Sequence, residues 1–412
     1  DENCSTNVSL KGKRSGFNAL GFQATIEALQ EEIRKLYLED NVPWIIGYSG
    51  GKDSTATLQL VWSSIEQLPN IQRKKTIHVI STDTLVENPA VAEWVTTSLE
   101  VMEKYATEKR MPISPHRLTP RIQDSFWVNL IGKGYPAPRH KFRWCTERLK
   151  IRPSNTFINN IVTVSGEAIL VLGTRKAEST RRAANMLKHE EGRVRDRLSP
   201  NSSLPGSLVY TPIEDWSNDD VWVYLMRQNN PWGIDNKDLL GLYSGASPDG
   251  ECPLVVDDST PSCGDSRFGC WVCTLVEKDK SMSAMIQNDS EKDWMLPLLD
   301  LRNALDFRTG KDSDDNDSSD RHLRDFRRMS GDVQVMAGGR PIPGPYLQSA
   351  RENWLRLLLK AQTIIRKQRH TAKRQIELIS LEELQEIRRI WVIDKHELED
   401  NLPKIYHEVT DV

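Results

Sequence analysis

The residues with the clearest chemical meaning form a glycine-rich loop, residues 49–54 (Ser-Gly-Gly-Lys-Asp-Ser). The apolar residues 44–46 before it predict a buried parallel strand, and apolar residues after it recur at helical spacing. Glycines let the backbone approach a ligand closely, and the free N–H groups at a helix N-terminus attract anions. The loop is therefore predicted to bind a phosphate or pyrophosphate group, with Lys52 adding a positive charge.

The spacing differs from that of the phosphate-binding loop of kinases and ATPases. That loop needs four residues between its glycines and a Ser or Thr directly after its Lys. Here three residues separate Gly47 from Gly51, and Asp53 follows Lys52. The sequence resembles instead the pyrophosphate loop of the ATP pyrophosphatases, the superfamily that includes PAPS reductases and tRNA thiolases. A glycine-rich turn that only starts a helix is the alternative.

The resemblance implies that ATP is cleaved between its α and β phosphates. It implies that the loop binds the nucleotide with a magnesium ion, and that the loop's last three residues act in catalysis. The nucleotide-binding residues would be Ser49, Gly50, Gly51, Lys52, Asp53 and Ser54, and the catalytic ones Lys52, Asp53 and Ser54.

Two further strand ends carry candidate nucleotide ligands. Residues 76–81 predict a strand that ends before Asp83. Ligands bind at the carboxyl edge of a parallel sheet, so Asp83 is expected to touch the nucleotide or its metal, although it could equally only cap or turn the chain. Residues 168–173 predict a buried strand, followed by a Gly-x-Arg-x-x-Glu-Ser pattern similar to that of PAPS reductase-like proteins. That resemblance implies that Gly173, Arg175 and Glu178 line the pocket.

Cysteines form the second chemical signal. Cys263, Cys270 and Cys273 lie within eleven residues, so their thiolates could converge on one metal centre. A fourth ligand must come from elsewhere, and the candidates are Cys252, Cys145 and, less favourably, Cys4. By spacing alone, structural zinc competes with an iron-sulfur cluster.

The whole set of motifs resembles the DndC family, the sulfurtransferases of DNA phosphorothioation, over roughly residues 40–290. The motifs are Gly-Tyr-Ser-Gly-Gly-Lys-Asp-Ser, Ile-Ser-Thr-Asp-Thr, Arg-Trp-Cys-Thr, Leu-Gly-Thr-Arg and Phe-Gly-Cys-Trp-x-Cys-Thr. The resemblance implies a 4Fe-4S cluster, with Cys252 left free as a candidate sulfur carrier. It also implies ATP and magnesium as cofactors, and DNA, a cysteine desulfurase and DndD- and DndE-type subunits as partners. The implied cluster ligands are Cys145, Cys263, Cys270 and Cys273.

One basic segment could contact DNA. Residues 139–152 hold six Lys or Arg against one Glu, and Phe142 and Trp144 are interleaved with them. Such a segment suits phosphate contacts, and Cys145 within it would put them next to the cluster. A solvated helix face is the alternative. The candidate DNA-binding residues are Arg139, Lys141, Arg143, Arg148 and Lys150.

Strands that alternate with helices predict an α/β fold with a doubly wound parallel sheet, similar to the adenine nucleotide α-hydrolases. We expect this domain over residues 18–235, a cysteine-rich iron-sulfur segment over 236–290 and a C-terminal helical region over 291–412. An acidic disordered linker is expected near 311–320, and a mobile loop, as a candidate lid, over 183–207.

Composition narrows the class of protein. The chain has 412 residues and a net charge of −3, so DNA contacts must come from local basic patches. It has no apolar run of about 20 residues, so a soluble, cytoplasmic protein without a membrane partner is expected. Six cysteines in a chain of this size do not make a disulfide scaffold.

Three rival functions remain for such a chain. Adenylylsulfate and PAPS reductases attack with a cysteine in a C-terminal tail, and no Cys follows Cys273 here. A tRNA thiolase shares the ATP chemistry, but two paired Cys-x-x-Cys zinc sites would favour it and one is present. A non-catalytic DNA-binding subunit is disfavoured by the intact loop.

Overall fold

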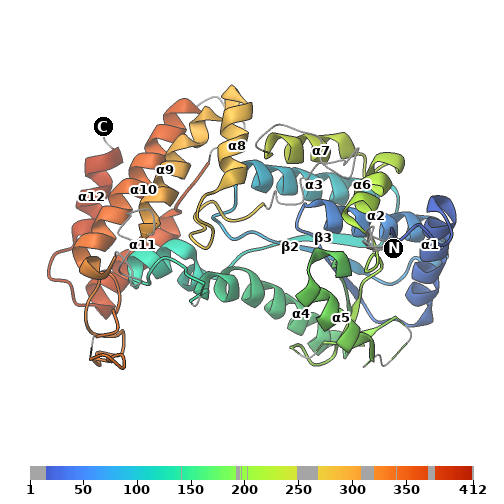
Figure 1. The fold of residues 1–412 in the computed structure, drawn as a ribbon, viewed down its shortest axis with the longest axis horizontal. Helices are drawn as coiled ribbons and strands as arrows, with labels where there is room; N and C mark the ends of the chain where they lie inside the picture. The colour runs from blue at the N-terminus through green and yellow to red at the C-terminus, as the bar shows by residue number, and fades with distance from the viewer. Residues whose placement is uncertain are drawn as a thin grey trace, which may run out of the picture.

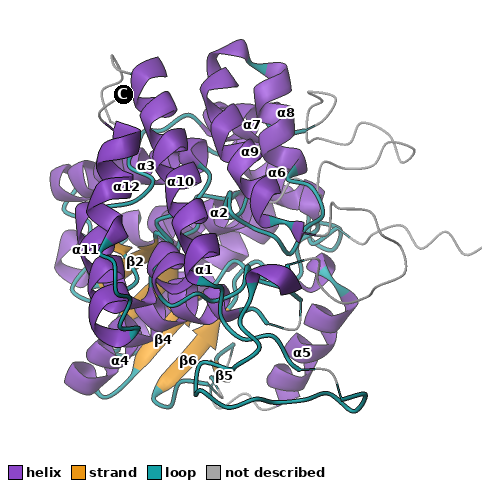
Figure 2. Cartoon of the chain, turned by 90° about the vertical axis from the view of Figure 1, so that its left-hand side faces the viewer, coloured by secondary structure: helices purple, strands orange, loops and turns teal. Residues whose placement is uncertain are grey.

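The computed structural model describes residues 15–140, 142–191, 195, 197–201, 203–247, 268–307, 320–339, 341–369 and 376–410. A six-stranded sheet lies at the centre of an α/β layer, and the C-terminal helices gather at one end of it (Figure 1). The second view shows the strands enclosed by helices (Figure 2).

The sheet is parallel except at one edge. Its strand order is β3-β2-β1-β4-β6-β5, and only β5 pairs antiparallel to its neighbour. The chain therefore winds outward from β1 in one direction and then crosses to the other side, which puts the topological switch point between β1 and β4. The strands are β1 (Trp44–Gly47), β2 (Ile77–Thr82), β3 (Ile113–Leu118), β4 (Ala168–Val171), β5 (Ser199–Pro200) and β6 (Ser207–Tyr210).

Helices cover both faces of this sheet. Alternate residues of one strand enter different cores: Ile46 packs in the core that contains α1, α2 and α3 residues, whereas Ile45 packs with Ile158 of α4. This two-sided burial explains why the central strands are apolar throughout. The helices are α1 (Phe22–Glu39), α2 (Lys52–Glu66), α3 (Pro89–Glu108), α4 (Arg152–Ser165), α5 (Thr180–Glu191), α6 (Asn218–Arg227), α7 (Asn236–Gly245), α8 (Lys280–Asn288), α9 (Leu296–Leu305), α10 (Gln348–Gln368), α11 (Leu381–Arg389) and α12 (Asn401–Thr410).

A separate hydrophobic core holds the C-terminal helices. It joins residues of α9, α10, α11 and α12 to Phe126, Leu149 and Trp271, so it crosses the expected boundaries at 235 and 290. Trp127 Nε1 donates to Leu378 O at 2.8 Å, and Trp391 Nε1 donates to Ile131 O at 3.0 Å. The helical region therefore braces the chain just before the basic segment.

The principal elements expected from the sequence are present. The structure confirms an α/β fold with a mostly parallel sheet and a helical C-terminal region. Ser217 and Asp220 form a capping box at α6, and Ser380 and Glu383 form another at α11. Among the described residues, no helix is both long and apolar enough to cross a membrane.

One expectation was wrong, and a second falls almost entirely outside the described residues. The segment expected as a mobile loop over 183–207 instead contains most of α5 and the strand β5, because Ser199 and Pro200 pair with β6. The expected linker 311–320 lies outside the described residues apart from Asp320, and that residue is fully buried. Asp320 pairs with Arg139 at 2.6 Å and accepts from Tyr346 at 3.2 Å, so it belongs to a packed ion pair.

Candidate functional site

The glycine-rich loop joins β1 to α2 and is fixed by close packing. Gly50 has a φ of 73°, and a Cβ there would lie 2.4 Å from Val95 Cγ2. Trp94 Nε1 donates to Gly50 O at 3.0 Å. The loop therefore requires glycine at this position and is held from the α3 side.

Several N–H groups at the start of α2 are free for a ligand. Gly51 is the N-cap residue and provides no side-chain cap, while Tyr243 Oη accepts from Lys52 N at 3.2 Å. In the part of the chain that the structure describes, the amides of Gly50, Asp53 and Ser54 donate no hydrogen bond outside the helix. Unpaired amides and the positive end of the helix dipole favour a phosphate group there.

Ion pairs hold the loop's charged residues. Arg175 Nε lies 2.7 Å from Asp53 Oδ1, and Lys52 Nζ lies 3.3 Å from Asp53 Oδ2. Arg175 is buried and also donates to Trp216 O at 3.3 Å, while its amide donates to Glu178 Oε1 at 2.9 Å. Arg175 thus positions Asp53, and Glu178 in turn positions Arg175.

Gly173 explains how β4 approaches the loop. A Cβ on Gly173 would lie 2.7 Å from Asp53 O and 2.9 Å from Thr57 Oγ1. Any larger residue would have to push the turn after β4 away from the first turn of α2. The glycine is therefore needed for the packing that brings Arg175 to Asp53.

A cavity of about 290 Å³ opens at the carboxyl edge of β1, β2 and β4. Two of the residues singled out by the sequence, Ser49 and Lys150, line it. This is the switch point of the sheet, where nucleotides bind in open α/β folds. Its wall is largely apolar, which suits a base or sugar. The lining residues include Gly47, Tyr48, Ser81, Thr82, Ser154 and Leu172.

Asp83 is occupied by contacts within the protein. Its Oδ1 accepts from Leu85 N at 2.8 Å, and its Oδ2 lies 3.3 Å from Arg117 of β3. Arg117 also lies 3.7 Å from Glu87. Burial raises the pKa of Glu87, an effect that Lys150 and Arg117 oppose. The turning role considered for Asp83 is therefore present, and its contact with a nucleotide stays a prediction.

The described cysteines lie beside this strand end. Trp271 N donates to Val86 O at 3.0 Å and Asn88 N donates to Gly269 O at 3.2 Å, which fastens the cysteine segment to the turn after β2. Cys270 Sγ lies 3.4 Å from Thr84 Oγ1. The cysteine segment and the nucleotide edge of the sheet are thus neighbours.

The thiols also influence one another. The surroundings of Cys270 exclude water and raise the pKa of its thiol to about 11, with a further upward contribution from Cys145. Burial raises the pKa of Cys145, and Cys273 adds to that rise. Three thiols in one region are the type of ligand that an iron-sulfur cluster requires. Among the described residues, however, no three metal-ligating side chains are close enough together to form a metal site. Cys252 and Cys263 lie outside the described residues.

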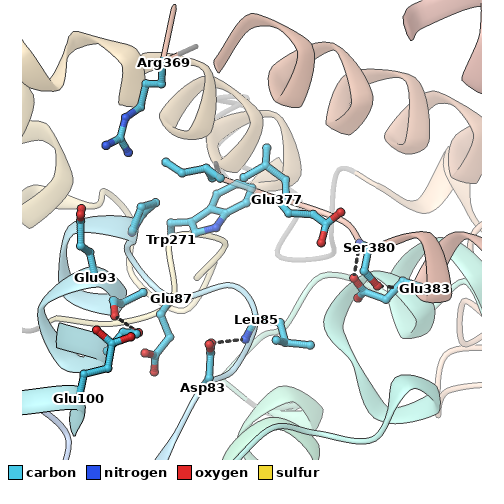
Figure 3. Close-up of a pocket in the computed structure, with 15 residues that line it drawn as sticks. Asp83, Leu85, Glu87, Glu93, Glu100, Trp271, Arg369, Glu377, Ser380 and Glu383 are labelled. Carbon is cyan, nitrogen blue, oxygen red and sulfur yellow. Dashed lines mark hydrogen bonds between the residues drawn. The ribbon is translucent and has the colours of Figure 1, made fainter. Parts of the chain in front are cut away.

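A second cavity of about 430 Å³ lies on the other side of Glu87 (Figure 3). Glu87 lines both cavities, and Trp271 lines the second one between α3 and the start of α11. Carboxylates dominate this second cavity, so it is unsuited to a polyanion. The acidic lining residues are Asp83, Glu87, Glu93, Glu100, Glu377 and Glu383.

The basic segment separates into structural and exposed residues. Arg139 is paired with Asp320, and Arg148 donates to Tyr135 Oη at 2.8 Å and also to Asn129. Arg143 and Lys150 are exposed. Lys141 lies outside the described residues. Two of the five candidate DNA-binding residues are therefore tied into the fold, and two remain available at the surface.

Sequence reasoning missed three residues at this site. Tyr243 of α7 contacts the loop. Glu87, in the turn before α3, lines the cavity, and Arg117 of β3 pairs with Asp83. No motif surrounds any of them. Only the carboxyl-edge position of Arg117 could have been inferred, had β3 been recognised as a strand.

Comparison with known proteins relates one segment of the chain to a known family. Residues 43–234 match the model of the phosphoadenosine phosphosulfate reductase domain family. This part of the chain is therefore similar to that family, and the match covers a little under half of the chain. The matched segment contains the loop, the Gly173 turn and Cys145, and it ends before the other described cysteines.

Individual relatives are more distant. The uncharacterized protein MJ0066 of Methanocaldococcus jannaschii is 28% identical over 260 residues, which is 63% of this chain and 40% of that protein. The chain thus spans about two fifths of that relative's length.

Solved structures give loose superpositions. A PAPS reductase from Candida auris in a phosphate complex has a TM-score of 0.31 at 14% identity, over 50% of this chain and 86% of that one. A tRNA thiolase, NcsA, from Methanococcus maripaludis with its 4Fe-4S cluster has a TM-score of 0.32 at 15% identity, over 69% and 80%. These superpositions are too loose to carry a functional argument.

The Gly173 contact yields a first prediction. Gly173→Ala should weaken ATP binding by about tenfold or more, because the added methyl group would displace Arg175 from Asp53 and disturb the first turn of α2. Calorimetric titration with ATP measures the effect. Gly241→Ala is the matched control, because a Cβ there meets nothing within 4 Å. An unchanged affinity in Gly173→Ala would show that this packing does not shape the nucleotide site.

Proposed function

We propose that the protein is an ATP-dependent sulfurtransferase that makes phosphorothioate linkages in DNA. The observation that carries the proposal is the loop with free amides at the switch point of the sheet, next to a segment that bears cysteines. ATP pyrophosphatase chemistry is the part that the similarity of residues 43–234 to the PAPS reductase domain supports, whereas DNA as the acceptor is the specific part of the proposal.

The loop would act on the leaving group. An oxygen of the acceptor phosphate attacks the α-phosphorus of ATP, the bond to the bridging α–β oxygen breaks, and pyrophosphate leaves. The acceptor oxygen then belongs to AMP, so sulfur can displace it. Free amides of the loop and Lys52 would stabilise the charge that develops on pyrophosphate, and a bound magnesium ion would add further positive charge there. The ion pair with Arg175 already fixes the orientation of the Asp53 side chain.

Cysteines would supply the route for sulfur. Cys145, Cys270 and Cys273, with Cys263, are the residues that would hold a 4Fe-4S cluster, through which sulfur would be delivered to the activated phosphate. Cys252 remains the candidate sulfur carrier, and a cysteine desulfurase the candidate donor. Cys270 contacts the turn after β2, which leaves a short path from this segment to the nucleotide edge.

Charge favours one approach for the acceptor. The cavity beyond Glu87 is acidic, whereas the nucleotide cavity is flanked by Lys150. A DNA backbone would therefore be drawn to the side of Lys150 and Arg143. DndD- and DndE-type subunits could extend this surface.

Metal analysis tests the cluster. We expect iron and acid-labile sulfide in protein purified without oxygen, and Cys145→Ser, Cys270→Ser or Cys273→Ser should each lower the iron content strongly because each removes a thiolate ligand. Cys252→Ser serves as the control and should leave iron nearly unchanged. Stoichiometric zinc in place of iron would overturn the cluster assignment.

DNA binding tests the acceptor. Replacing Arg143 and Lys150 together with Ala should weaken DNA binding and reduce the slope of log K against log salt by roughly two units, one for each lost phosphate contact. Lys35→Ala with Lys104→Ala makes the same charge change on the opposite face of the sheet, where both side chains are exposed. Filter binding or fluorescence anisotropy over a series of salt concentrations gives the slopes. If the Arg143 and Lys150 variant keeps the normal slope, this segment is a solvated face and DNA lies elsewhere.

A further inference from the structure

A tyrosine from outside the glycine-rich loop contacts the loop at the start of α2. Tyr243 belongs to α7, is 6% exposed, and accepts from Lys52 N at 3.2 Å. Its Oη also lies 3.2 Å from the point that a Cβ on Gly51 would occupy. Lys52 Nζ lies 5.5 Å from the centre of its ring. The phenol thus faces the same amide row that is left open for an anion.

The hydroxyl of Tyr243 has unused hydrogen-bonding capacity. A phenol can accept hydrogen bonds and donate one. In the described part of the chain, this hydroxyl accepts from Lys52 N and donates to no acceptor. Burial raises the pKa of Tyr243 and nearby Asp53 raises it further, so the phenol keeps its proton at neutral pH. A proton available for donation therefore points into an anion-binding loop.

We propose that Tyr243 is a pyrophosphate-binding residue, whose hydroxyl accepts from Lys52 N and donates to a non-bridging oxygen of the bound pyrophosphate. The inference rests on the proposed function, because it requires the loop to hold that group. It adds a neutral donor to the loop's amides and lysine, and this donor comes from a helix nearly 200 residues further along the chain.

The ring of Tyr243 also connects the loop to the cysteine segment. Phe268, two residues before Cys270, packs edge-to-face on it with ring centres 4.6 Å apart, and Trp222 packs on it at 5.2 Å. These contacts fix where the hydroxyl lies. They also mean that a purely structural role would depend on the ring, whereas a binding role depends on the hydroxyl.

Tyr243→Phe separates these roles because it keeps the ring and removes the hydroxyl. Calorimetric titration of the full chain with magnesium and inorganic pyrophosphate should show a Kd raised about tenfold or more, as expected for a lost hydrogen bond to a charged group. Binding of AMP should change less than twofold, because AMP lacks the β and γ phosphates that occupy the loop. Tyr224→Phe, a buried phenol on α6 whose ring packs on Trp216, is the control and should bind pyrophosphate normally.

The binding measurements distinguish a pyrophosphate-binding role of Tyr243 from a structural one. Wild-type protein that binds pyrophosphate, together with an unchanged Kd in Tyr243→Phe, would overturn the role of Tyr243 and leave the proposed function standing. Equal losses of pyrophosphate and AMP affinity would mean that the hydroxyl only supports the fold, which also overturns the inference. Wild-type protein that fails to bind pyrophosphate would overturn both the inference and the proposed function.

Discussion

The ion pair between Arg175 and Asp53 fixes the first turn of α2 against the end of β4. Arg175 is buried, so its charge needs a partner, and Asp53 Oδ1 at 2.7 Å provides it. The contact is feasible because Gly173 has no side chain between the two segments. Two neighbouring strands of the switch point are thereby locked to one helix start. The free amides of that start keep a fixed direction, which is what an anion site requires.

The rest of the molecule arranges other groups around this fixed point. The turn after β2 is bonded to the cysteine segment, and that segment contacts the loop through Phe268 and Tyr243. The C-terminal helices share a core with Trp271, so they support the same segment from behind. These contacts therefore connect the carboxyl edge of the sheet, the cysteine segment and the C-terminal helices into one unit, although the family model matches only residues 43–234.

Charge is distributed unevenly around this unit. Glu87 lines both cavities, one of which is flanked by Lys150, while the other has six acidic residues in its lining. A polyanionic acceptor would meet a positive charge at the cavity beside Lys150 and negative charges at the acidic cavity. This asymmetry favours approach over Lys150 and explains how a chain with a net charge of −3 could still bind a nucleic acid locally.

Local sequence signals predicted the local parts of this arrangement. The apolar strand β1, the glycine turn and α2 all follow from residues that are neighbours in the sequence. The edge strand β3 escaped notice because Pro115 and polar residues interrupt its pattern.

Long-range contacts could not be predicted in the same way. Tyr243 reaches Lys52 across 191 positions, and nothing near either residue signals the contact. Arg139 was predicted to be available for DNA because its partner, Asp320, is the last residue of an acidic segment that was predicted to be disordered. Sequence patterns report on burial and turns, whereas such pairs depend on how distant elements pack.

The products of ATP cleavage test the central claim most directly. We would incubate protein purified without oxygen with ATP, magnesium and DNA, and identify the phosphorus-containing products by ³¹P NMR. A loop that holds the departing pyrophosphate predicts AMP and pyrophosphate in equal amounts. ADP and inorganic phosphate as the main products would contradict this account, because the γ phosphate, and not the pyrophosphate, would then be the leaving group.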